Sequence, residues 1–128
     1  RHEASGRAVA SFLDDHPEVS RVLYPALPDH PGHELQRRQA GGFGALISFD
    51  LGSYEKAERV LNALEVMTLA ESLGGVETLI SHPASMTHAS IPRDQRLKIG
   101  ITDGLVRVSV GLEDEADLIA DLERALGA

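Results

Sequence analysis

Residues 105 to 112 read LVRVSVGL, and their alternation of apolar and polar side chains is the strongest fold signal in the chain. On a β-strand, successive side chains point to opposite faces of the sheet. One face would therefore carry Val106, Val108, Val110 and Leu112. The opposite face would carry Arg107 and Ser109. The pattern predicts a strand whose apolar face packs against helices and whose other face presents an arginine.

Helices and strands alternate in the sequence before this strand. Apolar residues spaced three and four positions apart predict helices over residues 2–15 and 53–65, and Ser53 is the expected N-cap of the second helix. The segment DHPGHELQRRQA, residues 29–40, predicts a loop that leads into a short polar helix. The strand-like segments are residues 19–24, 44–51 and 66–72.

The remaining segments complete an α+β pattern. Residues 73–91 contain glycines and prolines and predict a connection, and a short helix is expected between Pro92 and Gly100. The segment EDEADLIADLERAL predicts a final helix with Asp114 as its N-cap. Its core-facing positions are Leu118, Ile119, Leu122 and Leu126. Short strands interleaved with helices predict a mostly antiparallel sheet with helices packed on one face.

Length and composition are those of one soluble globular domain. The chain has 128 residues, 42% hydrophobic and 25% charged, and no apolar run approaches the ~20 residues that cross a bilayer. Its net charge of −8 would repel a phosphate backbone, which argues against nucleic acid as a partner. The absence of cysteine excludes disulfides and thiolate metal sites. Without a signal-peptide pattern, we expect a cytoplasmic protein.

Several short patterns are better explained by local structure than by chemistry. Two histidine pairs invite a metal hypothesis, His30 with His33 and His82 with His88. Neither spacing is typical of a zinc site, so we predict no metal site. Ser53 and Lys56 match the S-x-x-K pattern of penicillin-recognising enzymes, but Ser53 starts an amphipathic helix and the accompanying motifs are absent. No glycine-rich segment matches a phosphate-binding loop.

Arg107 and the AESLGG segment form the candidate site. A guanidinium on the less apolar face of a central strand requires a partner, and its planar fork fits a carboxylate. That carboxylate could belong to a ligand or to a structural salt bridge. Glu71 and Ser72 would point to opposite faces of a regular strand, so both reach one pocket only if the strand ends there. Gly74 and Gly75 permit such an ending.

Four long segments carry a resemblance to a known family. They are HPEVSRVLYPALPDHPGHELQRRQ, GGFGALISFDL, LAESLGGVETLISHPASMTHASIP and GITDGLVRVSVGLEDEADLIADLERAL, which together span nearly the whole chain. In these segments the chain resembles the C-terminal domain of the pyridoxal-phosphate (PLP) enzymes of cysteine and methionine metabolism, the transsulfuration family. Ala26 and Ala40 depart from the family pattern but lie outside the site.

The resemblance implies a substrate-binding role for four residues. In the family, the residues that match Arg107 and Ser72 hold the α-carboxylate of an amino-acid substrate, and the residue that matches Thr87 lies nearby. An acidic residue at the position of Glu71 resembles the cystathionine γ-synthases and γ-lyases, where its carboxylate would meet the distal ammonium of cystathionine. The alternative is that Glu71 pairs with a neighbouring cation. The implied activity is at the Cγ–S bond of cystathionine, with methionine γ-lyase and O-acyl-homoserine sulfhydrylase as alternatives.

The resemblance also implies parts that these 128 residues lack. The Schiff-base lysine and the phosphate site for PLP belong to the family's large domain, and neither Lys56 nor Lys98 matches them. We therefore expect no catalytic, cofactor-binding or metal-binding residue here, and no activity of this chain alone.

The expected organisation follows from the same resemblance. Residues 1–18 would be a helix that enters from the large PLP domain, and residues 19–128 would be the C-terminal substrate-carboxylate-binding domain. The full enzyme would be a homotetramer whose partners are the amino-acid substrate and the large domain. A rival from another class is a non-catalytic amino-acid-binding or oligomerisation module with the same α+β layout.

Overall fold

A computed structural model describes residues 1–128 and contains five helices and five strands. The helices are α1 (His2–Asp15), α2 (His33–Gln39), α3 (Tyr54–Ala63), α4 (Arg93–Lys98) and α5 (Glu115–Leu126). The strands are β1 (Arg21–Leu23), β2 (Leu46–Asp50), β3 (Thr68–Leu69), β4 (Leu79–Ser81) and β5 (Leu105–Ser109). All five predicted helices are confirmed, and the predicted strands are present with shorter bounds.

One five-stranded sheet organises the molecule, in the order β1-β2-β5-β4-β3. Every neighbouring pair is antiparallel except β3 and β4, which are parallel. The strand predicted from the segment LVRVSVGL, β5, lies at the centre of the sheet. Its register places Arg107 opposite Ser48 of β2 and Ser81 of β4. The predicted mostly antiparallel α+β fold is therefore confirmed.

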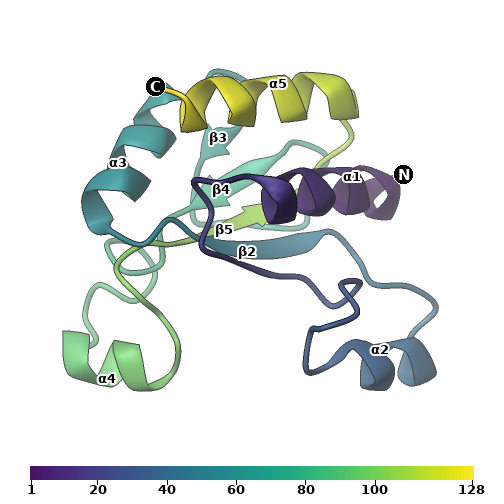
Figure 1. The fold of residues 1–128 in the computed structure, drawn as a ribbon, viewed down its shortest axis with the longest axis horizontal. Helices are drawn as coiled ribbons and strands as arrows, with labels where there is room; N and C mark the ends of the chain where they lie inside the picture. Colours follow the sequence, from purple (N-terminus) through teal and green to yellow (C-terminus); the bar gives the residue numbers. More distant parts are fainter.

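The helices α1, α3 and α5 cover one face of this sheet (Figure 1). The sheet residues facing them are fully buried: Ile47, Phe49, Ile80, Val106 and Val108. From the helix side, Val9 and Leu13 of α1 and Leu118 and Leu122 of α5 enter the same core. Figure 1 shows the short helices α2 and α4 on the other side of the sheet, well apart from each other. The second face, hereafter the open face, is the one that carries Arg107.

Both predicted helix caps are confirmed. The Ser53 hydroxyl accepts a hydrogen bond from the Lys56 N–H at 3.2 Å, and the Asp114 carboxylate accepts one from the Ala116 N–H at 2.9 Å. These side chains satisfy backbone donors that the first helical turn leaves without partners. No helix has both the length and the apolar character needed to cross a lipid bilayer.

Three expectations about strands were wrong in detail. The segment 73–91 is not all connection, because its residues Leu79–Ser81 form β4, a buried strand next to the centre of the sheet. Only Thr68–Leu69 of the extended segment 66–72 is a strand. Leu112 does not share the valine face but is 40% exposed. Strand β5 ends at Ser109, so the alternation of faces does not continue to that leucine.

Candidate functional site

Arg107 lies in the middle of β5, on the open face of the sheet. Its neighbours Val106 and Val108 point the other way and are fully buried under the helices. Because directly opposed residues of antiparallel strands project on the same side, Ser48 and Ser81 flank Arg107 on the open face. The rigid centre of the sheet thus holds a half-buried guanidinium between two serines.

The hydrogen bonding of Arg107 bears on the interpretation of this residue as part of a structural ion pair. Its Nη2 donates to the backbone carbonyl of Glu71 at 2.9 Å. None of the salt bridges in the structure involves Arg107, so the interpretation as a structural ion pair is wrong. A guanidinium has five N–H donors, and this one leaves its charge without an anionic partner in the chain. Arg107 is therefore free to bind an external carboxylate.

The segment after β3, residues 70–77, is tied by hydrogen bonds to β5 and to the residues that follow it. Besides the bond from Arg107 to Glu71, the Gly74 N–H donates to the Ser109 Oγ at 2.8 Å. Further along, the Leu112 N–H donates to the Val76 carbonyl at 2.7 Å. We call residues 70–77 the strap. It lies against the same strand that presents the candidate arginine, so its position relative to Arg107 is fixed.

Two glycines allow the strap to lie this close to the rest of the chain. Gly74 has a φ of +79°, in the left-handed region that L-residues rarely adopt. At Gly111, an added Cβ would lie 2.4 Å from the Val76 carbonyl oxygen. The strand β3 already ends at Leu69, five residues before this glycine, so Gly74 shapes the strap and does not end the strand. Any residue larger than glycine at position 111 would push the strap away.

The C-terminal end of the strap is anchored by a carboxylate. Glu113 accepts from both the backbone N–H and the hydroxyl of Thr78, each at 2.7 Å, and the Thr78 Oγ1 accepts from the Gly111 N–H at 2.8 Å. Burial raises the pKa of Glu113, but the hydrogen bonds from Thr78 outweigh burial and hold that pKa below its usual range. His2 adds a bond from α1, its Nε2 donating to the Gly75 carbonyl at 3.2 Å.

Glu71 and Ser72 are exposed on this strap, and their side chains have no partners in the structure. The backbone carbonyl of Glu71 is used by Arg107, whereas its carboxylate forms no ion pair or hydrogen bond. The alternative that Glu71 pairs with a neighbouring cation is therefore wrong. The structure brings both residues next to Arg107 with their side chains unoccupied.

Thr87 lies in the turns that follow β4 and is exposed. Its hydroxyl forms a 2.7 Å hydrogen bond with the Nδ1 of the adjacent His88 and with no residue of the strap. Of the four predicted site residues, Arg107, Glu71 and Ser72 lie together at β5, whereas no hydrogen bond links Thr87 to them.

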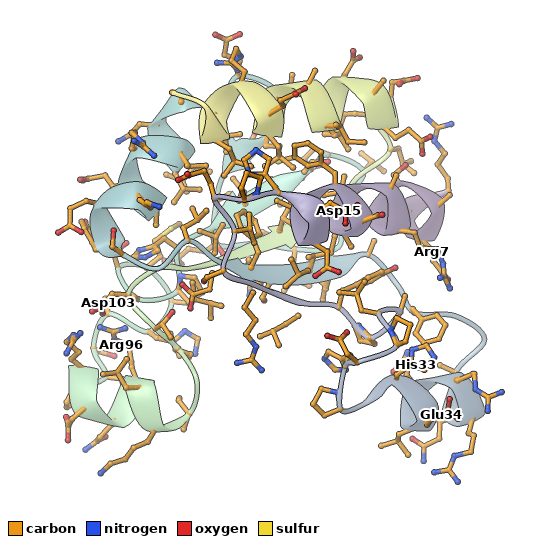
Figure 2. All side chains as sticks on the ribbon, in the orientation of Figure 1. Arg7, Asp15, His33, Glu34, Arg96 and Asp103 are labelled. Carbon is orange, nitrogen blue, oxygen red and sulfur yellow. The ribbon has the colours of Figure 1, made fainter.

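The short helices α2 and α4 lie on the side of the sheet opposite to α1, α3 and α5 (Figure 2). Figure 2 shows Arg96 and Asp103 facing each other at α4, where Arg96 Nη2 donates to the carboxylate at 2.9 Å. Arg93 donates to the same carboxylate at 2.7 Å. These two guanidinium groups, Arg93 first, hold the pKa of Asp103 below its usual range. The backbone carbonyl of Asp103 accepts from His82 Nε2 at 2.8 Å, which links α4 to the end of β4.

The residues considered for metal or cofactor chemistry have local partners instead. Lys56 Nζ pairs with the Glu18 carboxylate at 2.9 Å on the surface, and Lys98 is exposed at the end of α4. His33 Nδ1 donates to the Pro25 carbonyl at 2.8 Å, and its ring stacks on Phe43. No group of three or more metal-ligating side chains is present.

Two further serines lie at this site, Ser81 and Ser109, and neither was predicted as a site residue. Ser109 could have been found, because it shares the alternation that singles out Arg107. Ser81 could not, because it belongs to the strand β4 that the sequence did not reveal. The Ser81 hydroxyl is buried and is the one buried side-chain polar atom in the structure without a hydrogen-bond partner.

Comparison with known proteins gives a consistent result over the whole chain. Residues 1–127 match the family model described as Cys/Met metabolism PLP-dependent enzyme. A cystathionine gamma-lyase of Bacillus subtilis is 56% identical over 124 residues, which cover 97% of this chain and 33% of the relative. An L-methionine gamma-lyase of Fusobacterium nucleatum subsp. polymorphum is 53% identical over 127 residues, covering 98% of this chain and 32% of the relative.

A solved structure shares the fold closely. The cystathionine gamma synthase of Xanthomonas oryzae pv. oryzae, solved in complex with aminoacrylate and cysteine, superposes with a TM-score of 0.93 at 48% identity. The match covers 98% of this chain and 33% of that protein. The 128 residues thus span about a third of the length of the proteins they resemble.

Proposed function

Because the chain belongs to the PLP-dependent enzymes of cysteine and methionine metabolism, we propose that it is the C-terminal, substrate-carboxylate-binding domain of an enzyme that acts at the Cγ–S bond of cystathionine. The enzyme would be a γ-lyase or a γ-synthase. The observation that carries this proposal is Arg107, a guanidinium without an anionic partner beside the strap that presents Glu71 and Ser72. PLP would be held by a large domain outside these residues and would supply the electron sink for bond cleavage.

The role proposed for this chain is to bind and orient the substrate. Arg107 would grip the α-carboxylate with two parallel N–H donors, which fixes the amino acid in direction as well as position. Ser72 would donate its hydroxyl to the same carboxylate, and Thr87 would complete the wall on the β4 side. Because the Schiff-base lysine and the phosphate site would belong to the large domain, the chain alone would show neither a PLP absorbance band nor turnover.

The first test is Arg107→Ala in the full-length enzyme. Loss of a charged, bidentate contact should lower kcat/KM for L-cystathionine by roughly a hundredfold or more. The matched control is Arg21→Ala, which removes an exposed arginine from the edge strand β1 of the same sheet. A steady-state assay in which both variants behave alike would remove the carboxylate-binding role.

Glu71 supports cystathionine over methionine as the substrate. Its carboxylate is exposed and unpaired, so it is available to the distal ammonium that cystathionine has and methionine lacks. Glu71→Val should lower the kcat/KM ratio of cystathionine to methionine by about tenfold, the size of one lost contact to a charged group. An unchanged ratio would instead favour methionine γ-lyase activity, which the relative from Fusobacterium also supports. O-acyl-homoserine sulfhydrylase activity is the other alternative within the family.

Calorimetry distinguishes this proposal from its rival, a binding module that works without a cofactor. The 128-residue chain titrated with L-cystathionine in the absence of PLP should show negligible binding if it provides only half of a site. Tight binding would favour the module. The proposal also includes a cytoplasmic homotetramer, which sedimentation of the full-length protein and fractionation of its host cells would test.

A further inference from the structure

The Arg107 side chain must cross strand β4 to reach its partner. It starts on β5, and its Nη2 bonds to the carbonyl of Glu71, which follows β3. Strand β4 lies between β5 and β3, and the Ala70 N–H still donates to the Ile80 carbonyl of β4 at 2.9 Å. The guanidinium therefore passes over the open face of β4 on its way to the strap.

Ser81 is the β4 residue directly beneath this path. It is the register partner of Arg107, and such antiparallel partners have Cβ atoms about 5 Å apart on the same face. Ser81 is only 1% exposed, and its Oγ has no hydrogen-bond partner. A buried hydroxyl without a partner is rare in native proteins, and each instance requires an explanation. Here the register partner of Ser81 on the same face is Arg107, whose side chain carries a guanidinium.

We propose that Ser81 is a positioning residue for Arg107: its hydroxyl accepts a hydrogen bond from the guanidinium when that group turns to bind a substrate carboxylate. Two N–H groups would then bind the carboxylate, one would remain on the Glu71 carbonyl, and another would bind Ser81 Oγ. Support from two sides fixes the plane of the fork, which decides the direction of the bound amino acid. This inference rests on the proposed carboxylate-binding role of Arg107.

Ser48 provides a matched control on the other side of the same arginine. It is the register partner of Arg107 on β2, but the side chain of Arg107 bends away from it toward the strap. Ser48 is half-buried, and only the Ser81 hydroxyl is both buried and without a hydrogen-bond partner. The two serines therefore share chemistry and register with Arg107, and they differ in burial and in whether the guanidinium lies above them.

The test compares Ser81→Ala with Ser48→Ala in the full-length enzyme, using L-alanine and L-alaninamide, in which a carboxamide replaces the carboxylate, as probes in calorimetric titrations. Ser81→Ala should weaken L-alanine binding by about tenfold, the size of one hydrogen bond to a charged group, and leave L-alaninamide unchanged. Ser48→Ala should change both dissociation constants by less than about twofold. Equal effects of the two variants, or equal effects on the two probes, would overturn the inference.

Thermal unfolding separates positioning from a structural role. Since Ser81→Ala removes a buried hydroxyl that makes no hydrogen bond, the variant should keep its Tm or raise it. A lowered Tm together with weaker binding would show a structural role and contradict the inference.

A double-mutant cycle with Arg107→Ala separates this inference from the function on which it rests. In the Arg107→Ala background, Ser81→Ala should have no further effect on kcat/KM, because the serine acts through the arginine. If Arg107→Ala alone leaves carboxylate binding intact, the proposed function fails. If it abolishes binding but Ser81→Ala has the same effect with and without the arginine, only the role of Ser81 fails.

Discussion

The two faces of the sheet are built on different principles. The helix-covered face is a continuous apolar layer in which Phe49, Val106 and Val108 are fully buried. The open face has polar groups along the same strands, and Ser109 and Arg107 hold the strap there through single hydrogen bonds. Burial of apolar area on the first face stabilises the fold, whereas the polar groups of the second face fix the position of the strap beside Arg107. The apolar core and the proposed ligand contact thus lie on opposite sides of the same strand.

The comparison predicts that the largest stability loss comes from the helix-covered face. Phe49→Ala leaves a cavity in a fully buried position and should lower the free energy of unfolding by about 3–5 kcal/mol. Leu46→Ala is the control on the same strand, because Leu46 is 45% exposed on the open face and should cost less than about 1 kcal/mol. Urea unfolding of both variants measures the difference. Equal losses would mean that the two faces are not distinct in energy.

A smaller but pH-dependent loss is expected at Asp121 of α5. This buried carboxylate accepts from the backbone N–H groups of Glu65, Val66 and Met67 at 2.9 to 3.0 Å. Asp121→Ala leaves these donors without their charged acceptor and should cost about 3 kcal/mol at pH 7. Asp121→Asn keeps one acceptor oxygen and should lose less.

The sign of the pH dependence follows from the pKa of Asp121. Burial raises this pKa, but the three backbone donors, Met67 first, and then Arg124 outweigh burial and lower it. The unfolded chain has an Asp pKa of about 3.9, so the stabilisation is fully present above that pH and is lost as pH falls through the lower folded value. The difference in stability between wild type and Asp121→Ala should therefore shrink below about pH 4. A constant difference down to pH 2 would contradict this assignment.

The smallest effect is expected on the open face itself. Ser109→Ala removes the acceptor for the Gly74 N–H and should cost about 1 kcal/mol or less, which falls on the strap rather than on the whole domain. Hydrogen exchange at the Gly74 amide should speed up severalfold, while the amide of Val108 in the same strand keeps its rate. If both amides accelerate together, the strap and the sheet open as one unit.

The apolar side of this comparison could be predicted from the sequence. The alternation of LVRVSVGL and the helical spacing of α3 and α5 identify buried positions directly, because burial on a regular element repeats with its period. Ser53 and Asp114 were recognisable as caps because a capping side chain acts within three residues of its own position. Arg107 was recognisable as the polar exception on a central strand.

The rest depended on contacts between residues far apart in the chain. Strand β4 has three residues, all buried, so it shows no alternation that marks a strand. In the sequence, Asp121 looks like any other polar residue of a helix. Its hydrogen-bond partners lie 54 to 56 positions away in the chain, so no local pattern marks it as buried. The position of Thr87, away from the strap, and the buried hydroxyl of Ser81 follow from the course of β4 and have no local signal.

The anchors of the strap lie late in the chain, and this has a consequence for biosynthesis. The strap and Thr78, which follows it, are held by Ser109, Gly111 and Glu113. These three residues lie 33 to 35 positions after their hydrogen-bond partners in the chain. The ribosome therefore synthesises Glu71 and Ser72 well before it synthesises strand β5, against which the strap lies. The nascent polypeptide can therefore fix the position of the strap only after Glu113 has been synthesised, and a premature stop codon before position 105 would remove both the anchors and the arginine.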